Sequence, residues 1–192
     1  MTDAKILAFA GSNKRTSVNR KALAVAVDGA RDAGADVTVL DLKDYPLPIM
    51  DEDLEAAEGL PENAAKLQAI FGDHDGFLIA CPEYNGLITP LLKNTIDWVS
   101  RPGENGSGLQ YYKGKTAALV AASPGGLGGL RGLTHVRALM TNLGAIVLPN
   151  QVAVSGARKL FDEDGTLNDD AKADQLRGVG AALAQVTGAL KS

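Results

Sequence analysis

The sequence predicts an α/β protein with an open, mostly parallel sheet of about five strands and helices on both faces. Short, continuously apolar segments recur along the chain, which is typical of strands covered on both faces. Amphipathic segments with a helical period separate them. This alternation runs without a linker or an internal repeat, and 192 residues is a usual length for one domain, so we expect a single domain over 1–192.

The first strand, 5–10, is apolar after Lys5 and stops at Gly11. The helix that follows begins at Ser17 or Asn19, either of which can cap it, and closes at Gly34. Residues 37–40 predict a second strand. The two prolines and three consecutive acidic residues within 45–53 cannot continue that strand, so we expect a surface loop there.

The rest of the chain repeats this pattern. We expect further strands at 76–81, 115–122 and 145–148, and helices at 62–71, 92–99, 130–143 and 176–190. Ligands of such sheets bind beyond the carboxyl ends of the strands, where the strand order reverses. The loops after the first, third and fourth strands are therefore the places to look for a site.

Composition excludes several kinds of protein. The net charge is −4, and Lys and Arg are not clustered, which argues against a nucleic-acid partner. Cys81, His74 and His135 lie far apart and make no zinc set, and we expect no metal. Apolar stretches end well short of the ~20 residues that span a membrane, and we do not expect the first residues to act as a secretory signal. We expect a cytoplasmic protein without membrane contact.

The first loop, 11–19, favours an anion. It places Ser12, Lys14, Arg15 and Ser17 at the start of a helix, where free N–H groups and the helix dipole attract negative charge. The alternative is a plain capping loop. The sequence is neither a Walker loop nor a G-x-G-x-x-G turn, so we expect a phosphate bound in another way.

The second and third loops also suit a ligand. Residues 82–86 form a tight turn in which Tyr84 and Asn85 can face a planar ligand, although a simple turn with Tyr84 packed on its neighbours is the alternative. Residues 123–129 hold four glycines before a helix that we expect to begin near Leu127 with free N–H groups. Three such turns on one edge of a sheet predict one joined site.

Other conspicuous residues have simpler interpretations. We expect Cys81 to be a small buried hydrophobe, Trp98 to pack in the core and His135 to lie on the surface or in an interface. Residues 162–165 fit a turn better than a calcium loop, because the glycine comes too early. The segment 100–114 fits either a subunit contact or a lid.

Several short motifs together resemble a known family. They are Gly11-Ser12 with Ser17 and Asn19, Pro82-Glu83-Tyr84-Asn85-Gly86, Thr89-Pro90, Lys93-Asn94, Ile96-Asp97-Trp98 and the glycine loop after Ser123. This set is similar to the NAD(P)H-dependent FMN reductases, which include bacterial quinone, azo-dye and chromate reductases. The resemblance covers about residues 5–148, and 82–98 is its most specific part.

The resemblance implies a flavodoxin-like three-layer fold with strand order 2-1-3-4-5. It implies FMN as cofactor and NADPH or NADH as co-substrate, with hydride passing to FMN and then to quinones, azo compounds or metal oxyanions. It also implies a homodimer or homotetramer. No side chain is expected to act as a catalytic acid or base, because the cofactor carries the chemistry.

The resemblance also implies which residues contact FMN. Those near the phosphate are Ser12, Lys14, Arg15, Ser17, Val18 and Asn19, and those near the ribityl chain and ring are Pro82, Glu83, Tyr84, Asn85, Gly86, Ser123 and Gly126. The family's usual arginine position is Lys14 here, so both Lys14 and Arg15 are candidates for the phosphate contact. The competing functions are a flavodoxin-type FMN electron carrier and a flavin-free regulatory protein of the same fold.

Overall fold

A computed structural model describes residues 4–104, 106–162 and 164–191 of the chain. Its centre is a five-stranded parallel sheet in the order β2-β1-β3-β6-β7. These strands are β1 (Lys5–Ala10), β2 (Asp36–Leu40), β3 (Gly76–Ala80), β6 (Thr116–Ala122) and β7 (Ile146–Val154). Strands β4 and β5 form a separate hairpin. When only the five strands of the main sheet are numbered along the chain, their order is 2-1-3-4-5, and the predicted α/β fold is confirmed.

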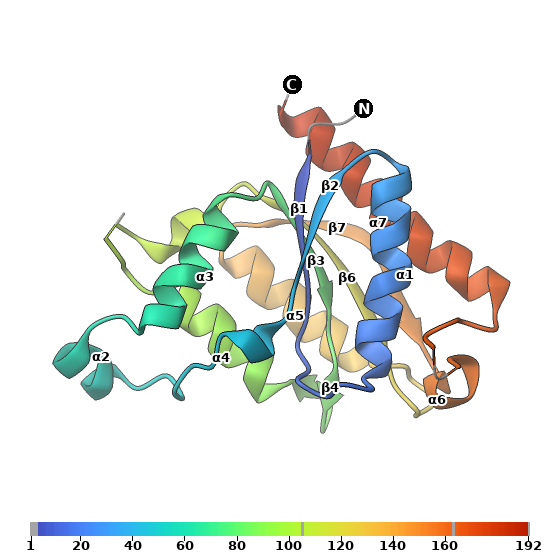
Figure 1. Ribbon diagram of the computed structural model, residues 1–192, viewed down its shortest axis with the longest axis horizontal. Coiled ribbons are helices and arrows are strands. Elements are labelled where there is room, and N and C mark those ends of the chain that lie inside the picture. Colours follow the sequence, from blue (N-terminus) through green and yellow to red (C-terminus); the bar gives the residue numbers. More distant parts are fainter. Residues whose placement is uncertain (1–3, 105, 163, 192) are drawn as a thin grey trace.

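Helices cover both faces of the sheet (Figure 1). One face carries α1 (Val18–Asp32) and α7 (Asp170–Lys191), and the other carries α3 (Glu62–Gly72), α4 (Pro90–Val99) and α5 (Leu130–Asn142). Every residue of β3 and β6 is buried, which explains why these strands are apolar without alternation. In the described ranges, no helix combines the length and apolar character that crossing a membrane requires.

Helices α1 and α7 pack against each other through glycines. A Cβ atom on Gly180 would overlap the carbonyl oxygen of Ala26, and one on Gly29 would overlap the backbone of Arg177. Each helix therefore needs a residue without a side chain at the crossing.

The last strand is longer than the predicted 145–148. It continues through Pro149, where its pairing with β6 shifts: Ala117 pairs with Val147, but Leu119 pairs with Gln151. Proline is compatible with a strand at such an irregularity on the edge of a sheet. The extension carries β7 to the level of the end of β6, so the chain that follows emerges at the same edge as the three loops.

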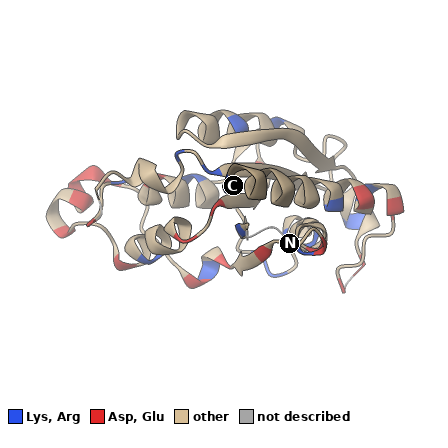
Figure 2. Ribbon diagram, turned by 90° about the horizontal axis from the view of Figure 1, so that it is seen from above, with Lys and Arg blue, Asp and Glu red and all other residues tan. Residues whose placement is uncertain are grey.

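The expectation of a loop over 45–53 is wrong at its acidic end. After the short helix η1 (Leu42–Asp44), Asp51 caps helix α2 (Glu52–Glu58), and its Oδ1 accepts the N–H of Asp53 at 2.9 Å. Carboxylates in a first turn also interact favourably with the helix dipole. No residue of α2 is buried, and its acidic residues lie at one end of the molecule (Figure 2).

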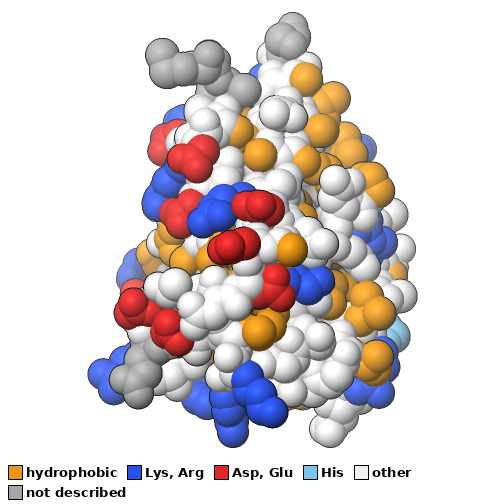
Figure 3. Space-filling view, turned by 90° about the vertical axis from the view of Figure 1, so that its right-hand side faces the viewer, with side chains coloured by type: hydrophobic (Ala, Val, Ile, Leu, Met, Phe, Trp, Pro, Cys, Tyr) orange, Lys and Arg blue, Asp and Glu red, His pale blue; other side chains and the backbone are white. Residues whose placement is uncertain are grey.

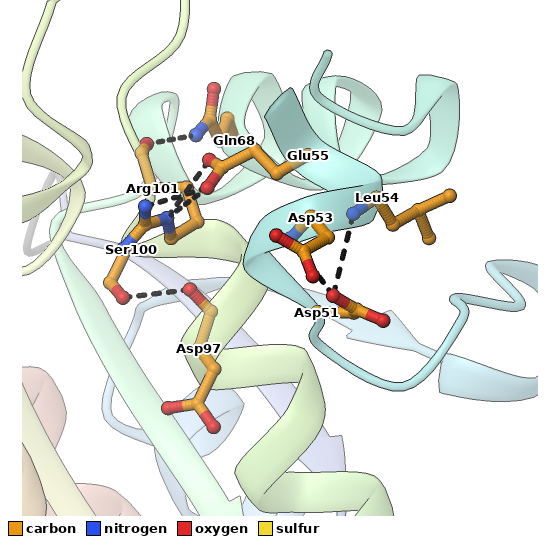
Figure 4. Close-up of polar contacts among 8 residues, drawn as sticks. All are labelled: Asp51, Asp53, Leu54, Glu55, Gln68, Asp97, Ser100 and Arg101. Atoms are coloured by element: carbon orange, nitrogen blue, oxygen red, sulfur yellow. Dashed lines mark hydrogen bonds and ion pairs between the residues drawn. The ribbon is translucent and has the colours of Figure 1, made fainter. Parts of the chain in front are cut away.

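The segment 100–114 is anchored to the rest of the fold. Asn105 lies outside the described residues. Arg101 donates from Nε and Nη2 to the carboxylate of Glu55 on α2, at 2.9 and 2.6 Å (Figure 4). Tyr112, just after the short helix η2 (Gly108–Tyr111), is fully buried in the core. The described part of the segment is thus held on both sides, which argues against a lid.

Candidate functional site

A cavity of about 460 Å³ lies at the carboxyl edge of the sheet, where β1, β3 and β6 end. The strand order reverses between β1 and β3, so this is the switch point of the fold. The predicted site residues that line the cavity are Ser12, Lys14, Ser17, Val18, Asn19, Pro82, Glu83, Tyr84 and Ser123. The predicted residues that lie in the same loops but outside this lining are Arg15, Asn85, Gly86 and Gly126.

The first loop presents the start of α1 to the cavity. The hydroxyl of Ser12 accepts the N–H of Lys14 at 3.3 Å, and the carbonyl of Lys14 accepts the N–H of Ser17 at 3.1 Å. Ser17 is the N-cap residue, yet its buried hydroxyl makes no capping hydrogen bond with the described residues. The N–H groups of the first turn therefore have no side-chain acceptor, and this arrangement suits an anion.

Asn19 connects this loop to the neighbouring strand. It lies inside α1 rather than capping it, and it is 5% exposed. Its Nδ2 donates to the carbonyl of Ala122 at 2.7 Å, and its Oδ1 accepts the N–H of Ala122 at 2.9 Å. Both amide atoms are thus paired with the last residue of β6, which holds the first and third loops at a set distance.

The second loop is a hairpin of β4 (Glu83–Tyr84) and β5 (Leu87–Ile88). Its turn is Asn85-Gly86, and both residues have positive φ angles, of 53° and 84°. Asn-Gly is a preferred sequence for such turns because both residues tolerate that backbone conformation. The hairpin leaves Tyr84 at the rim of the cavity with 61% of its surface exposed.

Glu83 points away from the solvent and toward α5. Its Oε2 accepts the N–H of Gly132 at 3.0 Å, and its Oε1 accepts Nε and Nη2 of Arg131 at 3.0 and 2.6 Å. The Gly132 N–H, together with the Arg131 guanidinium, holds the pKa of Glu83 below its ordinary value. These bonds fasten the hairpin to the first turn of α5.

This contact corrects two expectations about the third loop. Helix α5 begins at Leu130, as its apolar period over 130–143 indicates, and not near Leu127. In its first turn, the N–H of Gly132 is not free for a ligand, since the carboxylate of Glu83 accepts it. The intervening turn needs glycine: Gly129 has a φ of 93°, and a Cβ there would come within 2.9 Å of the Cβ of Ala121.

Three residues for which we expected no role in binding lie where the sequence predicted. Cys81 is fully buried, and burial raises the pKa of its thiol, so it is held as a neutral group. Trp98 is also fully buried, and its Nε1 donates to the carbonyl of Pro48 at 2.8 Å. His135 is exposed on α5.

The sequence reasoning missed part of the cavity wall. The unpredicted lining residues are Thr16, Lys21, Ala122, Pro124, Arg158, Phe161 and Asp162. Three of them come from the short helix α6 (Ala157–Leu160) and the residues just after it. The extension of β7 to Val154 brings the following chain to this edge, and that extension is a property of the sheet that the sequence did not indicate.

A parallel sheet of this order, with a polar cavity at its switch point, defines a flavodoxin-like protein. The chain belongs to the NADPH-dependent FMN reductase family, whose model matches residues 4–159. The chain is 36% identical over 175 residues to an NAD(P)H-dependent FMN reductase of Pseudomonas aeruginosa, which covers 91% of this chain and 89% of the relative.

Two further relatives agree with this assignment. The chain is 34% identical over 184 residues to an NAD(P)H:quinone oxidoreductase of Solanum tuberosum, with 93% of this chain and 90% of the relative covered. Among solved structures, it resembles the flavoenzyme NAD(P)H:(acceptor) oxidoreductase FerB of Paracoccus denitrificans, with a TM-score of 0.80 and 25% identity. That comparison covers 96% of this chain and 97% of FerB.

Proposed function

We propose that this protein is an FMN-dependent NAD(P)H oxidoreductase that reduces quinones and similar small acceptors. The observation that carries the proposal is the cavity at the switch point, which joins the uncapped start of α1 to the β4–β5 hairpin. Membership in the NADPH-dependent FMN reductase family and similarity to quinone oxidoreductases support the same activity.

The residues of the cavity fit FMN. Its volume of about 460 Å³ is within the range of roughly 300–1,000 Å³ for small-molecule sites. The Ser17 hydroxyl and the first N–H groups of α1 suit the phosphate, and Lys14 adds positive charge there. Because Lys14 lines the cavity and Arg15 does not, Lys14 is the better candidate for the phosphate contact.

The other end of the cavity suits a flat ring. The hairpin places its backbone and the exposed ring of Tyr84 beside the opening, where a second flat molecule can approach from solvent. When bound, FMN supplies reversible hydride transfer, and the protein positions it and sets its electrostatic surroundings. Glu83 helps to position the hairpin, because its carboxylate binds the N–H of Gly132 on α5 and pairs with the guanidinium of Arg131.

An absorbance spectrum followed by an anaerobic titration with NADPH or NADH tests this function. We expect the purified protein to contain FMN or to take it up. We also expect its flavin absorbance to bleach on addition of reduced nicotinamide and to return on addition of a quinone. A protein that stays colourless after incubation with FMN would contradict the proposal and favour the flavin-free regulatory protein.

Rapid mixing with NADPH or NADH separates the enzyme from a flavodoxin-type carrier. A carrier binds FMN, but its flavin stays oxidised on the timescale of enzyme turnover. Bleaching within a turnover time supports the reductase. A flavin that reduced nicotinamide leaves oxidised would instead identify an electron carrier.

A further inference from the structure

The wall of the cavity formed by α6 is attached to the third loop. Gly156, with a φ of 60°, starts the turn, and its N–H donates to the carbonyl of Gly125 at 3.2 Å. The N–H of Ala157 donates to the carbonyl of Ser123 at 3.0 Å. Two backbone hydrogen bonds therefore set the position of α6 relative to the end of β6.

The same wall is also attached to the core and to α1. Phe161 is 8% exposed and packs in the hydrophobic core between the sheet and helices α1 and α7. The ammonium group of Lys21, in the first turns of α1, donates to the carbonyl of Asp162. In Figure 1, α6 lies beside the end of α1 at which that helix begins. Arg158, one turn of helix before Phe161, is thus carried by a segment held at both ends.

Positive charge collects where α6 meets the start of α1. Lys14, Lys21 and Arg158 come from three different segments and line the same cavity. Lys and Arg side chains gather at the lower end of this face of the molecule (Figure 3). Of the two carboxylates in the lining, Glu83 is paired with Arg131.

The second carboxylate of the lining, that of Asp162, bonds to Asn168 and not to Arg158. Asp162 accepts Nδ2 of Asn168 at 2.8 Å through its side chain. No carboxylate in the described ranges forms an ion pair with Arg158. Arg158 is exposed at the cavity, where its guanidinium can bind an anion.

We propose that Arg158 binds the terminal phosphate of the flavin nucleotide, together with the first loop. Ser17 supplies an independent sign that an anion belongs there, because its hydroxyl is 6% exposed, lines the cavity and has no partner among the described residues. A guanidinium matches two phosphate oxygens at once, whereas an ammonium such as that of Lys14 acts as a single charge. This inference rests on the proposed FMN-dependent function.

Binding of FMN and riboflavin to the flavin-stripped full-length chain, followed by flavin fluorescence, tests this inference. Riboflavin lacks the phosphate but keeps the ring and ribityl chain. We expect Arg158→Ala to weaken FMN binding by roughly 10- to 100-fold, as for loss of a hydrogen bond to a charged group. Riboflavin binding should change by less than about twofold, because the affected group is absent.

Two variants keep the test specific. Lys159→Ala removes a neighbouring exposed cation that does not line the cavity, and we expect it to bind FMN like the wild type. Arg158→Lys keeps the charge without the fork, and we expect it to bind FMN with intermediate affinity. Equal losses for FMN and riboflavin in Arg158→Ala, or no loss for FMN, would overturn the role of Arg158 while leaving the proposed function intact. A wild-type chain that binds neither flavin would overturn both.

Discussion

The side-chain amide of Asn19 makes both of its hydrogen bonds to the backbone of one residue, Ala122, at 2.7 and 2.9 Å. Asn19 belongs to α1 and Ala122 ends β6, so a single side chain joins two walls of the cavity. These two bonds indicate that Asn19 positions the walls of the cavity relative to each other. Contact with FMN stays a prediction for Asn19.

Removing this link should cost stability. We expect Asn19→Ala to lower the free energy of unfolding by about 1–3 kcal/mol, because the N–H and carbonyl of Ala122 lose their partners in a buried place. Urea denaturation measures the change. Asn142→Ala, at the exposed end of α5, is the matched control and should shift the unfolding free energy by less than about 0.5 kcal/mol. Equal effects of the two substitutions would contradict the proposed role.

The contact of Glu83 with Gly132 and Arg131 predicts a dependence of stability on pH. The pKa of Glu83 is lowered in the folded protein, so its contribution is present above the ordinary glutamate range and is lost as the pH falls through the lowered value. We expect Glu83→Gln to be about 1–3 kcal/mol less stable than the wild type at pH 7. The difference should shrink at pH 3.

Unfolding free energies of both proteins at pH 7 and pH 3 give the comparison. Glu58→Gln, on the exposed helix α2, controls for the loss of one negative charge and should leave stability nearly unchanged at both values. A deficit in Glu83→Gln that is the same at pH 3 and pH 7 would show that the ionised carboxylate is not what fastens the hairpin.

Two glycines of α7 should respond in opposite directions to alanine. Gly180→Ala places a methyl group against the carbonyl oxygen of Ala26, and we expect a loss of about 1–3 kcal/mol or more from overpacking. Gly178 has open space around it, so Gly178→Ala should gain about 0.5–1 kcal/mol from helix propensity alone. Chemical denaturation of both variants tests the close crossing of α1 and α7, and a gain at Gly180 would exclude it.

Lys115 stabilises the end of α3. Its ammonium donates to the carbonyls of Phe71, Gly72 and His74, and burial lowers the pKa of this lysine. We expect Lys115→Met to cost about 2 kcal/mol, because these carbonyls lose a charged donor. That loss corresponds to a drop in Tm of about 4–8 °C by calorimetry. Lys113→Met, two residues earlier and exposed, should leave Tm within about 1–2 °C of the wild type, a limit set by the small effect of exposed substitutions.

The fold was predictable because its signals are local. The buried runs of β1, β3 and β6 contain only apolar or small residues after Lys5 and Thr116, and the helices between them show a regular period. The start of α2 was not recognised, because Asp51 and its acidic neighbours suit a polar loop and a capped first turn equally well. The full length of β7 was missed because a proline inside a strand is tolerated only at an edge, and edge position is a property of the sheet.

The alternation of strands and helices, and the three short polar or glycine-rich loops at one edge of a parallel sheet, could be predicted from local sequence patterns. The contacts of the side chains at that edge depend on the folded chain. Folding paired Glu83 with α5 and Asn19 with β6, and it brought Arg158 to the first loop across more than half of the chain. Apolar periodicity reflects only which side of an element is buried. The partner of a polar side chain depends on which distant segments the completed sheet brings within hydrogen-bonding distance.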